Sequence, residues 1–438
     1  MLEALKRSRL RRFALCVEQG ELFEAACYVV TRSGIRLPPP PPRPRQSTPR
    51  TMNGRQARPR IAATVHSLSL QGAPISLLEI LGGLIRITDY DIHLISPSDG
   101  PLRQRAEALG CTVHLVASPQ DDSAGERAYE HGVGQFARFL ETLGPDVLMA
   151  NSMASFHAVD AARLLGIPTI WLIRESDSPE SFFSPYPRAI QARALACLDY
   201  PQKTIFVSQS TMDRWPRRDA RVLIRTVPDA SSIERLLDSW SRIEARRALQ
   251  LTDDEVMVLT VGTLCANKGQ MDLVQAAIAL ANAAVRMRIV FVGSVSEPGG
   301  HAITRALSRL PKRLNGIIEV HDATADIGKY YAAADIYVCS SRRESYPRTI
   351  LEALAFGLPI VATTVDGIAE VLDDAASRSY VPGDVDALTA SLADLAPSAE
   401  ARAAMATSSR QRWAQIGLDD RMIERYAREL DQLLANTP

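Results

Sequence analysis

The most informative part of this 438-residue sequence is the stretch 339–354, which reads CSSRRESYPRTILEAL. The apolar run Ile336 to Cys339 that leads into it predicts a buried strand, and Pro347 can occupy the first position of a following helix. Glu344 therefore follows the strand, and Glu352 lies inside the helix. Two fixed carboxylates with a helix N-terminus between them suit a ligand that combines hydroxyl groups with phosphates, because a helix N-terminus attracts phosphates. Taken alone, two glutamates at this spacing are also typical of ordinary surface charge.

Strand-like and helix-like segments alternate on both sides of this stretch. Further apolar runs in the second half of the chain are Val256–Val261, Arg288–Val292, Gly316–Val320 and Pro359–Thr363. Similar runs in the first half are Ile61–Val65, Ile92–Ile95, Val113–Val116, Val147–Ala150, Thr169–Ile173 and Thr204–Val207. Helical periodicity fills the intervals, as in Ile75, Leu78, Leu81 and Ile85. This alternation predicts parallel strands joined by crossover helices, in two doubly wound units in tandem.

The length of the chain exceeds what one hydrophobic core usually supports, which favours two domains of ordinary size. A charged, helical stretch, Ser232 to Leu251, separates the two series of strands. We therefore expect an α/β fold with one Rossmann-like domain at residues 59–235 and a second at residues 236–418. Residues 419–438 are predicted to form an amphipathic helix that packs back on the first domain, because one face carries Met422, Ile423, Tyr426, Leu430, Leu433 and Leu434.

Residues 1–58 differ in composition from the rest of the chain. Pro38 to Pro42 are unbroken proline, and residues 1–60 hold thirteen basic and four acidic side chains. Such a segment favours extended polyproline geometry and cannot bury a core, so we expect a basic, proline-rich extension and linker. Two interpretations stay open: a poorly ordered or misassigned start, or a basic tether to acidic lipid or to a partner protein.

Composition and charge narrow the classes of function. Lysine plus arginine equals aspartate plus glutamate, at 50 residues each, so net charge gives no support for a nucleic-acid partner. The six cysteines show no spacing typical of a metal site, and we expect reduced thiols. No apolar stretch approaches the roughly 18 to 20 residues that span a bilayer. We expect a cytoplasmic protein, and the basic arm adds the hypothesis of peripheral contact with the inner membrane face.

Two strand-to-helix turns are candidate ligand loops, because ligands of open α/β sheets bind at the carboxyl ends of strands. Residues 66–74 read HSLSLQGAP, and the single glycine, Gly72, in place of G-x-G-x-x-G disfavours a dinucleotide-dependent dehydrogenase. Residues 259–269 read LTVGTLCANKG, with Lys268 just before a predicted helix. A lysine there can neutralise a diphosphate that the helix N-terminus also attracts. A lone turn glycine or loop lysine is, however, more often structural or solvated.

Several further segments keep a fixed order with these motifs over residues 250–372. They are YAAADIYV at 331–338, GLPIVAT at 357–363 and VDGIAE at 365–370, together with the Gly262 to Lys268 loop and the E-x7-E pattern from Glu344 to Glu352. In this order and spacing they resemble glycosyltransferase family four, whose fold is GT-B, with two facing Rossmann-like domains. The resemblance extends more weakly into residues 61–210 and does not cover residues 1–58.

The resemblance implies a role for each matching residue. Glu344 would contact donor-sugar hydroxyls and act in catalysis with Lys268, which would hold the diphosphate. Glu352 would bind the nucleotide ribose, and Gly72 would face the phosphates from the first domain. The resemblance also implies that the donor is bound by Gly262, Thr263, Arg348, Thr349, Asp366 and Gly367. Backbone amides near Arg348 and Thr349 would help to hold the diphosphate.

Three positions depart from the family pattern. Thr263 stands where the family commonly has an arginine, so Lys268 would carry more of the phosphate charge, or Arg342 or Arg343 would compensate. Arg174 occupies the place of a histidine that often follows the fifth strand. The first loop has Gln71 in place of the first glycine of a pair.

The resemblance implies a retaining glycosyltransferase that moves a sugar from a UDP-, GDP- or ADP-sugar to a saccharide, lipid-linked or small-molecule acceptor. The nucleoside diphosphate would leave from the front side of the sugar, stabilised by Lys268 and by the helix N-terminus at Pro347. No Asp-x-Asp pair sits at a predicted strand end, so we expect no obligatory metal ion and no cofactor besides the donor. Two alternatives stay open: a nucleotide-sugar epimerase, and a catalytically silent nucleotide-sugar-binding partner of another transferase.

Overall fold

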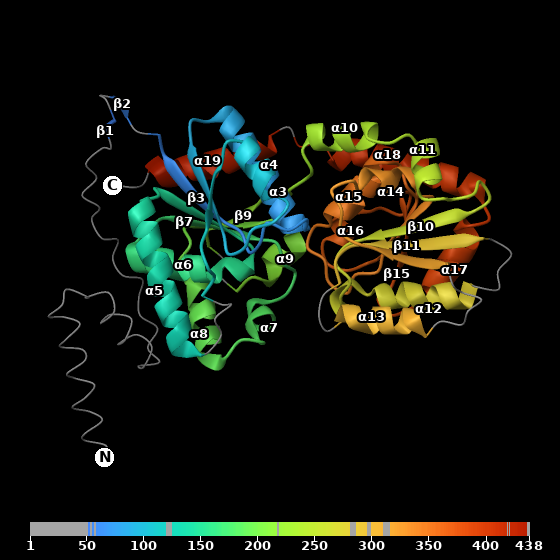
Figure 1. The fold of residues 1–438 in the computed structure, drawn as a ribbon, viewed down its shortest axis with the longest axis horizontal. Helices are drawn as coiled ribbons and strands as arrows, with labels where there is room; N and C mark the ends of the chain where they lie inside the picture. Colours follow the sequence, from blue (N-terminus) through green and yellow to red (C-terminus); the bar gives the residue numbers. More distant parts are fainter. Residues whose placement is uncertain are drawn as a thin grey trace, which may run out of the picture.

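The computed structural model describes residues 51–52, 55–56, 58–119, 125–216, 219–280, 286–295, 299–309, 316–417, 419 and 421–435. These residues form two parallel sheets that lie side by side, each with helices on both faces (Figure 1). The strand order is β5-β4-β3-β6-β7-β8-β9 in the first sheet and β12-β11-β10-β13-β14-β15 in the second. All neighbouring strands of both sheets are parallel. The predicted α/β class with two doubly wound units is confirmed.

The strands are short and most are buried. Those of the first sheet are β3 (Arg60–Thr64), β4 (Asp91–Ser96), β5 (Thr112–Leu115), β6 (Val147–Asn151), β7 (Thr169–Ile173), β8 (Lys203–Phe206) and β9 (Arg221–Leu223). Those of the second are β10 (Val256–Val261), β11 (Met287–Val292), β12 (Ile318–His321), β13 (Ile336–Cys339), β14 (Ile360–Thr363) and β15 (Ser377–Tyr380). A separate antiparallel pair, β1 (Thr51–Met52) and β2 (Arg55–Gln56), belongs to neither sheet. The remainder of the predicted extension at residues 1–58 lies almost entirely outside the described residues.

Helices connect the strands in both units. The first unit contains α3 (Gly72–Ile87), α4 (Arg103–Ala108), α5 (Glu126–Leu143), α6 (Phe156–Leu165), α7 (Pro179–Phe183), α8 (Arg188–Ala196) and α9 (Gln209–Arg214). The second follows α10 (Ala230–Asp238) and α11 (Arg242–Ala248) and contains α12 (Gln270–Leu280), α13 (Gly299–Ser308), α14 (Gly328–Ala333), α15 (Arg348–Ala355), α16 (Ile368–Val371), α17 (Val385–Leu395) and α18 (Ala399–Ile416), before α19 (Met422–Ala435). Within the described ranges, no helix has the length and apolar character that crossing a bilayer requires.

Within the two large sheets, strands β9 and β15 have no counterpart in the predicted apolar runs. Both lie at an edge of their sheet, where one side of the strand has no neighbouring strand. The sequence of β15 is SRSY, in which only the first and last residues are buried. An edge strand can therefore form from residues that give no apolar run, whereas the central β6 and β7 are buried at every position.

Three clusters of buried side chains form the core. One lies between the first sheet and helices such as α5 and α6, and another between the second sheet and helices such as α12 and α17. The third combines the opposite faces of both sheets with residues of α3, α14, α15 and α19. The two units therefore share one apolar cluster on the side of these four helices.

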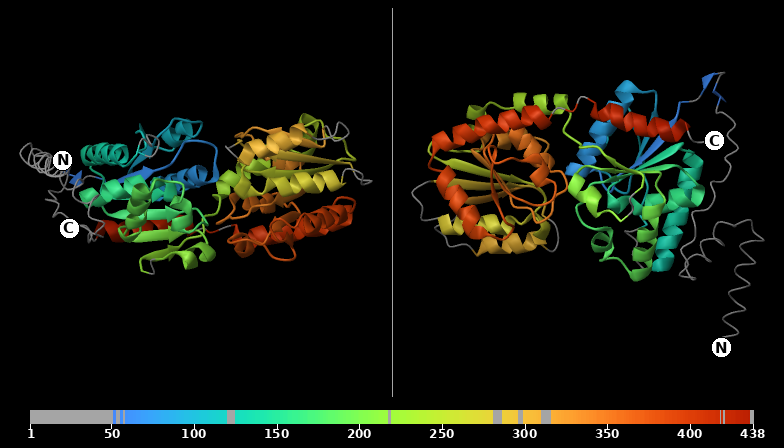
Figure 2. Two further views of the ribbon diagram at one scale, coloured as in Figure 1. Left: turned by 90° about the horizontal axis from the view of Figure 1, so that it is seen from below. Right: turned by 180° about the vertical axis from the view of Figure 1, so that it is seen from behind.

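The C-terminal helix α19 leaves the second unit and packs on the first. It lies against the first unit (Figure 2) and contacts α3 and β6. Its buried apolar stripe includes Tyr426 and Leu430. The approach to α3 is close, because a Cβ atom added at Gly83 would lie 2.6 Å from the side chain of Ile423. Lys203 at the start of β8 adds an ion pair of 2.8 Å to Glu429 of the helix.

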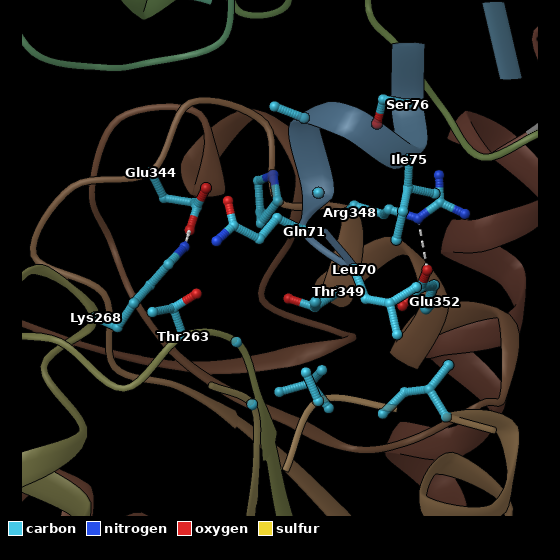
Figure 3. A pocket seen from close by; sticks show the side chains of 18 of the residues that line it. Leu70, Gln71, Ile75, Ser76, Thr263, Lys268, Glu344, Arg348, Thr349 and Glu352 are labelled. Atoms are coloured by element: carbon cyan, nitrogen blue, oxygen red, sulfur yellow. Dashed lines mark hydrogen bonds and ion pairs between the residues drawn. The ribbon is translucent and has the colours of Figure 1, made fainter. Parts of the chain in front are cut away.

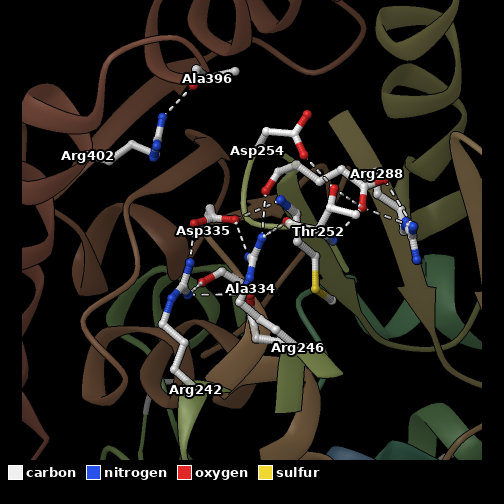
Figure 4. A network of polar contacts seen from close by, with 12 residues as sticks. Arg242, Arg246, Thr252, Asp254, Arg288, Ala334, Asp335, Ala396 and Arg402 are labelled. Carbon is white, nitrogen blue, oxygen red and sulfur yellow. Dashed lines mark hydrogen bonds and ion pairs between the residues drawn. The ribbon is translucent and has the colours of Figure 1, made fainter. Parts of the chain in front are cut away.

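A polar network fixes α11 to the second sheet (Figure 4). Asp335 accepts hydrogen bonds from Arg246 at 3.0 Å and from the backbone N–H of Met257 at 2.8 Å, and it pairs with Arg242. Arg246, which is 8% exposed, also donates to the carbonyl oxygens of Thr252 and Glu255. The charged stretch between the two series of strands thus packs against the start of the second sheet, because its arginines bind carbonyl and carboxylate groups there.

Candidate functional site

A pocket of about 350 Å³ lies between the carboxyl ends of the two sheets (Figure 3). The first unit contributes residues 70–73, 75 and 76 after β3, together with Arg174 after β7, Val207 after β8 and Thr226 after β9. The second contributes the turns that follow β10, β11, β12 and β13. In parallel sheets the carboxyl ends of the strands and the N-termini of the following helices meet at one edge, which is where such sheets bind ligands.

Most of the residues predicted for the site line this pocket. The turn after β3, the turn after β10 and the start of α15 bring them together from both units. The predicted residues found in the lining are Gly72, Gly262, Thr263, Lys268, Glu344, Arg348, Thr349 and Glu352. Asp366 and Gly367 are not in the lining.

Lys268 and Glu344 form an ion pair across the pocket wall, joining the turn after β10 to the turn after β13 (Figure 3). The Glu344 carboxylate also accepts a hydrogen bond of 3.3 Å from the Ser341 hydroxyl. Burial lowers the pKa of Lys268, but the charge and hydrogen bond of Glu344, together with the nearby Cys339 and Cys265, outweigh this effect, so the pKa lies above its usual value. The lysine is therefore protonated and positioned at the pocket.

The backbone around Lys268 is fixed by close packing of the two turns. Gly269 has a φ of +62°, and a Cβ atom there would lie 2.0 Å from the carbonyl oxygen of Ser340. The Ser340 hydroxyl donates to the carbonyl oxygen of Lys268 at 2.9 Å. Only glycine allows this approach, which aligns the lysine with the loop that carries Glu344.

Asp366 and Gly367 support the Glu344 loop from behind. The Gly367 N–H donates to the carbonyl oxygen of Glu344 at 3.0 Å, and the Glu344 N–H donates to the Asp366 carboxylate at 3.3 Å. A Cβ atom at Gly367 would lie 1.4 Å from the carbonyl oxygen of Ser345. Asp366 is also paired with Arg214 of α9, a helix of the first unit. Asp366 and Gly367 therefore support the loop that carries Glu344 and do not line the pocket themselves.

Glu352 is held in a buried ion network that joins the two units. Its carboxylate accepts hydrogen bonds from Arg348 Nε at 2.7 Å and from the Tyr331 hydroxyl at 2.9 Å. The two terminal nitrogens of Arg348, Nη1 and Nη2, donate hydrogen bonds of 2.5 and 2.8 Å to Glu79 of α3. Burial would lower the pKa of Arg348, but the two carboxylates raise it well above its ordinary value. A helix of the first unit thus positions a residue of the second.

Glu79 is a residue that the sequence motifs do not identify. Its side chain is fully buried. It lies within the apolar run ISLLEILGGLI of α3, and this position is the feature of the sequence that could have identified it. A glutamate in the buried stripe of a helix is rarely without a partner, so it indicates a buried cation nearby but does not say which one.

The arginines expected to compensate for Thr263 lie outside the pocket lining. Arg342 is paired with Asp272 at 2.7 Å. Arg343 donates to the carbonyl oxygen of Ser176 at 3.4 Å and is 42% exposed. Arg174 does line the pocket. The structure therefore places this arginine, and not Arg342 or Arg343, in the lining of the same pocket as Lys268.

Comparison with known protein families follows the division into two units. Residues 70–230 match the family described as "Glycosyltransferase Family 4", and residues 255–397 match the family described as "Glycosyl transferases group 1". The two segments together cover more than half of the chain.

Named relatives include a GDP-mannose-dependent alpha-mannosyltransferase of Mycobacterium tuberculosis, which is 27% identical over 72% of this chain and 81% of its own. A D-inositol 3-phosphate glycosyltransferase of Saccharomonospora viridis is 30% identical over 46% of this chain and 49% of its own.

Solved structures share the fold over most of the chain. Anabaena HepE in complex with UDP-glucose superposes with a TM-score of 0.69 at 18% identity, covering 85% of this chain and 99% of that one. The glycosyltransferase WaaG gives a TM-score of 0.66 at 15% identity, covering 84% of this chain and 98% of that one. The chain has the GT-B fold and belongs to glycosyltransferase family four.

Proposed function

We propose that this glycosyltransferase moves a sugar from a nucleotide-sugar to a saccharide, lipid-linked or small-molecule acceptor and retains the anomeric configuration. The observation that carries the proposal is the convergence of Lys268, Glu344 and the N-terminus of α15 on one pocket between the two sheets. A nucleotide-sugar combines an anionic diphosphate with sugar hydroxyls, and these three features offer partners for both. The mannosyltransferase relative is named for GDP-mannose, and the HepE structure contains UDP-glucose.

The diphosphate would lie between Lys268 and the start of α15. A lysine ammonium has three N–H donors, and the ion pair with Glu344 uses one of them. Helix α15 begins without a side-chain cap, and its first residues, Arg348 and Thr349, line the pocket, so their backbone amides would donate to phosphate oxygens. Donors fixed before the reaction stabilise charge that develops on a leaving diphosphate. Gly72, Gly262 and Thr263 would line the same region.

Glu344 and Glu352 would bind hydroxyl groups at two ends of the donor. Glu344 lies beside Lys268, where the sugar bonded to the diphosphate would be, so it would accept from sugar hydroxyls. Glu352 lies further along α15, and each of its oxygens already accepts one hydrogen bond. A carboxylate has about four acceptor positions, which leaves room for ribose hydroxyls. Asp366 and Gly367 would act indirectly, by holding the Glu344 loop.

A thermal-shift panel of UDP-, GDP- and ADP-sugars tests the donor. Nucleotide-sugars that carry one of the three bases should raise the melting temperature of the wild type. The Lys268→Ala variant should lose most of that shift. Arg378→Gln is a matched control, because Arg378 is 48% exposed and lies on β15, outside the pocket. The absence of any shift with every nucleotide-sugar and nucleoside diphosphate would contradict the proposal.

Product analysis separates transfer from the alternatives. An axial or equatorial assignment of the new glycosidic bond by NMR tests retention. A donor recovered with an inverted sugar centre and no acceptor consumed would indicate an epimerase. Donor binding without transfer or hydrolysis would indicate a silent partner of another transferase.

A further inference from the structure

Arg174 differs from the other basic side chains in the pocket lining, because it has no acidic partner. Lys268 is paired with Glu344, and Arg348 is paired with two glutamates. Arg174 makes its side-chain hydrogen bonds to neutral groups, and within the described part of the chain no carboxylate lies at ion-pair distance from its guanidinium. None of the residues described in the structure therefore neutralises its positive charge by an ion pair.

Neutral side chains fix the orientation of this guanidinium. Nε donates to Asn151 Oδ1 at 3.0 Å, and Nη1 donates to the Thr226 hydroxyl at 2.8 Å. Asn151 is fully buried at the end of β6, and its amide group donates to the carbonyl oxygen of Ala73 at 3.2 Å. Thr226 is in turn hydrogen-bonded to Tyr426 of α19 at 2.9 Å. Three segments of the first unit and the C-terminal helix α19 thus hold Arg174 in one position.

The second terminal nitrogen of Arg174, Nη2, is shielded from bulk solvent and has no hydrogen-bond partner among the residues that the structure describes. Buried donors in native proteins are nearly always paired, so an exception of this kind indicates a missing acceptor. The partner of a charged guanidinium with two N–H groups to fill is best an anion, and phosphate oxygens match this geometry. A sugar hydroxyl would satisfy the hydrogen bond but would leave the charge uncompensated.

The space beside Arg174 suits such a group. Helix α3 begins at Gly72 with no side-chain cap, and both Gly72 and Ala73 line the pocket. A Cβ atom added at Gly72 would have no atom within 4 Å, so the helix start borders open space. The N-terminus of a helix of this length favours negative charge in that space. Arg174 supplies the independent and stronger attraction.

We propose that Arg174 binds a phosphate group of a pocket ligand from the first unit, opposite Lys268 of the second. The inference rests on the proposed function, and it adds a phosphate-binding side chain that comes from the first unit. Two sources have this chemistry: the diphosphate of the donor, and a phosphate carried by the acceptor.

Isothermal titration of Arg174→Gln tests the proposal, with Arg378→Gln as the control. The probes are UDP, GDP and ADP, and then inorganic phosphate added to protein with and without a saturating nucleoside diphosphate. If the source is the donor, Arg174→Gln should weaken the nucleoside diphosphate that binds the wild type by at least about tenfold. If it is the acceptor, that affinity should stay within twofold, while the wild type binds inorganic phosphate beside the nucleotide and the variant does not.

The proposal is overturned if Arg174→Gln matches the wild type with both kinds of probe. It is also overturned if the wild type binds neither, and that outcome removes the proposed function too. Nucleotide binding by the wild type that Arg174→Gln leaves intact, with no phosphate site, removes this inference alone. If Arg174→Gln does not fold, Arg174→Lys decides, because it keeps the charge but loses the guanidinium fork. Wild-type affinities in the lysine variant would then count against the proposal.

Discussion

Lys268 is the residue whose removal should reduce activity most directly. Lys268→Ala removes a charge-assisted contact worth about 1.5 to 3 kcal/mol, so kcat/KM should fall about ten- to hundredfold. Lys268→Gln should be nearly as poor, and Thr263→Arg should partly restore Lys268→Ala, because Thr263 lines the same part of the pocket. Steady-state kinetics against Arg343→Ala measure the effect, since Arg343 is an exposed cation outside the pocket lining. A larger loss in Arg343→Ala would move the phosphate site.

The pH dependence of this contact follows from the raised pKa of Lys268. A lysine whose pKa is raised by folding contributes its ion pair at every pH below the ordinary value of about 10.4. That contribution is lost only as the pH rises through the raised value. The ratio of wild-type to Lys268→Ala kcat/KM should therefore stay constant between about pH 6 and 9.

Glu344 and Glu352 should differ in the kinetic constant that they affect. Glu344→Gln should lower kcat more than it weakens donor binding, because its carboxylate lies beside the cation at the leaving group. Glu352→Gln should mainly weaken donor binding, because ribose contacts persist in the ground state. Titration of the donor and single-turnover rates separate the two effects. Wild-type constants in both variants would end the assignment of both residues.

The contact between α3 and α15 is the element-scale feature that joins the two units at the site. Arg348 lies between Glu79 and Glu352, and Arg348→Met leaves the buried Glu352 carboxylate without its ion-pair partner and Glu79 with only a 3.8 Å ion pair to Arg105. Loss of one partner from a buried ion pair destabilises by about 3 to 5 kcal/mol. Glu79→Gln should destabilise less, because the pair between Arg348 and Glu352 survives.

Urea denaturation checks this order, with Arg378→Met as the matched control. Arg378 makes an exposed ion pair with Asp394, so its loss should change the free energy of unfolding by less than about 1 kcal/mol. An Arg348→Met variant as stable as Arg378→Met would show that the buried network contributes nothing to joining the units.

Local patterns explain which elements could be predicted. Strands such as β6 and β13 are buried along their length, so the sequence shows them as apolar runs, whereas the edge strand β15 is half polar. The Glu344 to Glu352 spacing likewise identifies one wall of the pocket. The partner of Arg348 could not be predicted this way, because Glu79 is 269 residues distant and pairs with it only through the tertiary fold. For the same reason the positions of Arg174, Arg342 and Arg343 needed the structure. The domain limits at residues 58, 235 and 418 stay predictions.

At the scale of the whole molecule, α19 ties the end of the chain to the first unit. Its buried residues complete the core cluster that both sheets share, and Tyr426 supports Thr226 beside the pocket. Deletion of residues 419–438 should expose the surface of α3 and β6 that the helix covers. We expect a loss of several degrees in melting temperature and a lower yield of soluble protein, measured by calorimetry and gel filtration. A truncated chain with wild-type stability and donor binding would show that α19 is dispensable.

Residues 1–58 should behave in the opposite way. The sequence has no periodic apolar face after Arg36, and the described pair β1 and β2 bonds to neither large sheet. Deletion of residues 1–58 therefore removes basic charge and proline but no part of either sheet, and the melting temperature should change by less than about 2 °C. A larger drop would mean that the arm packs on the folded units.

The same variant tests the membrane hypothesis, because thirteen basic side chains before residue 61 favour binding to acidic lipid. When phosphatidylserine vesicles are sedimented, the full chain should be found in the pellet and the deletion variant should stay in the supernatant. Equal sedimentation of both proteins would assign any lipid binding to the folded units.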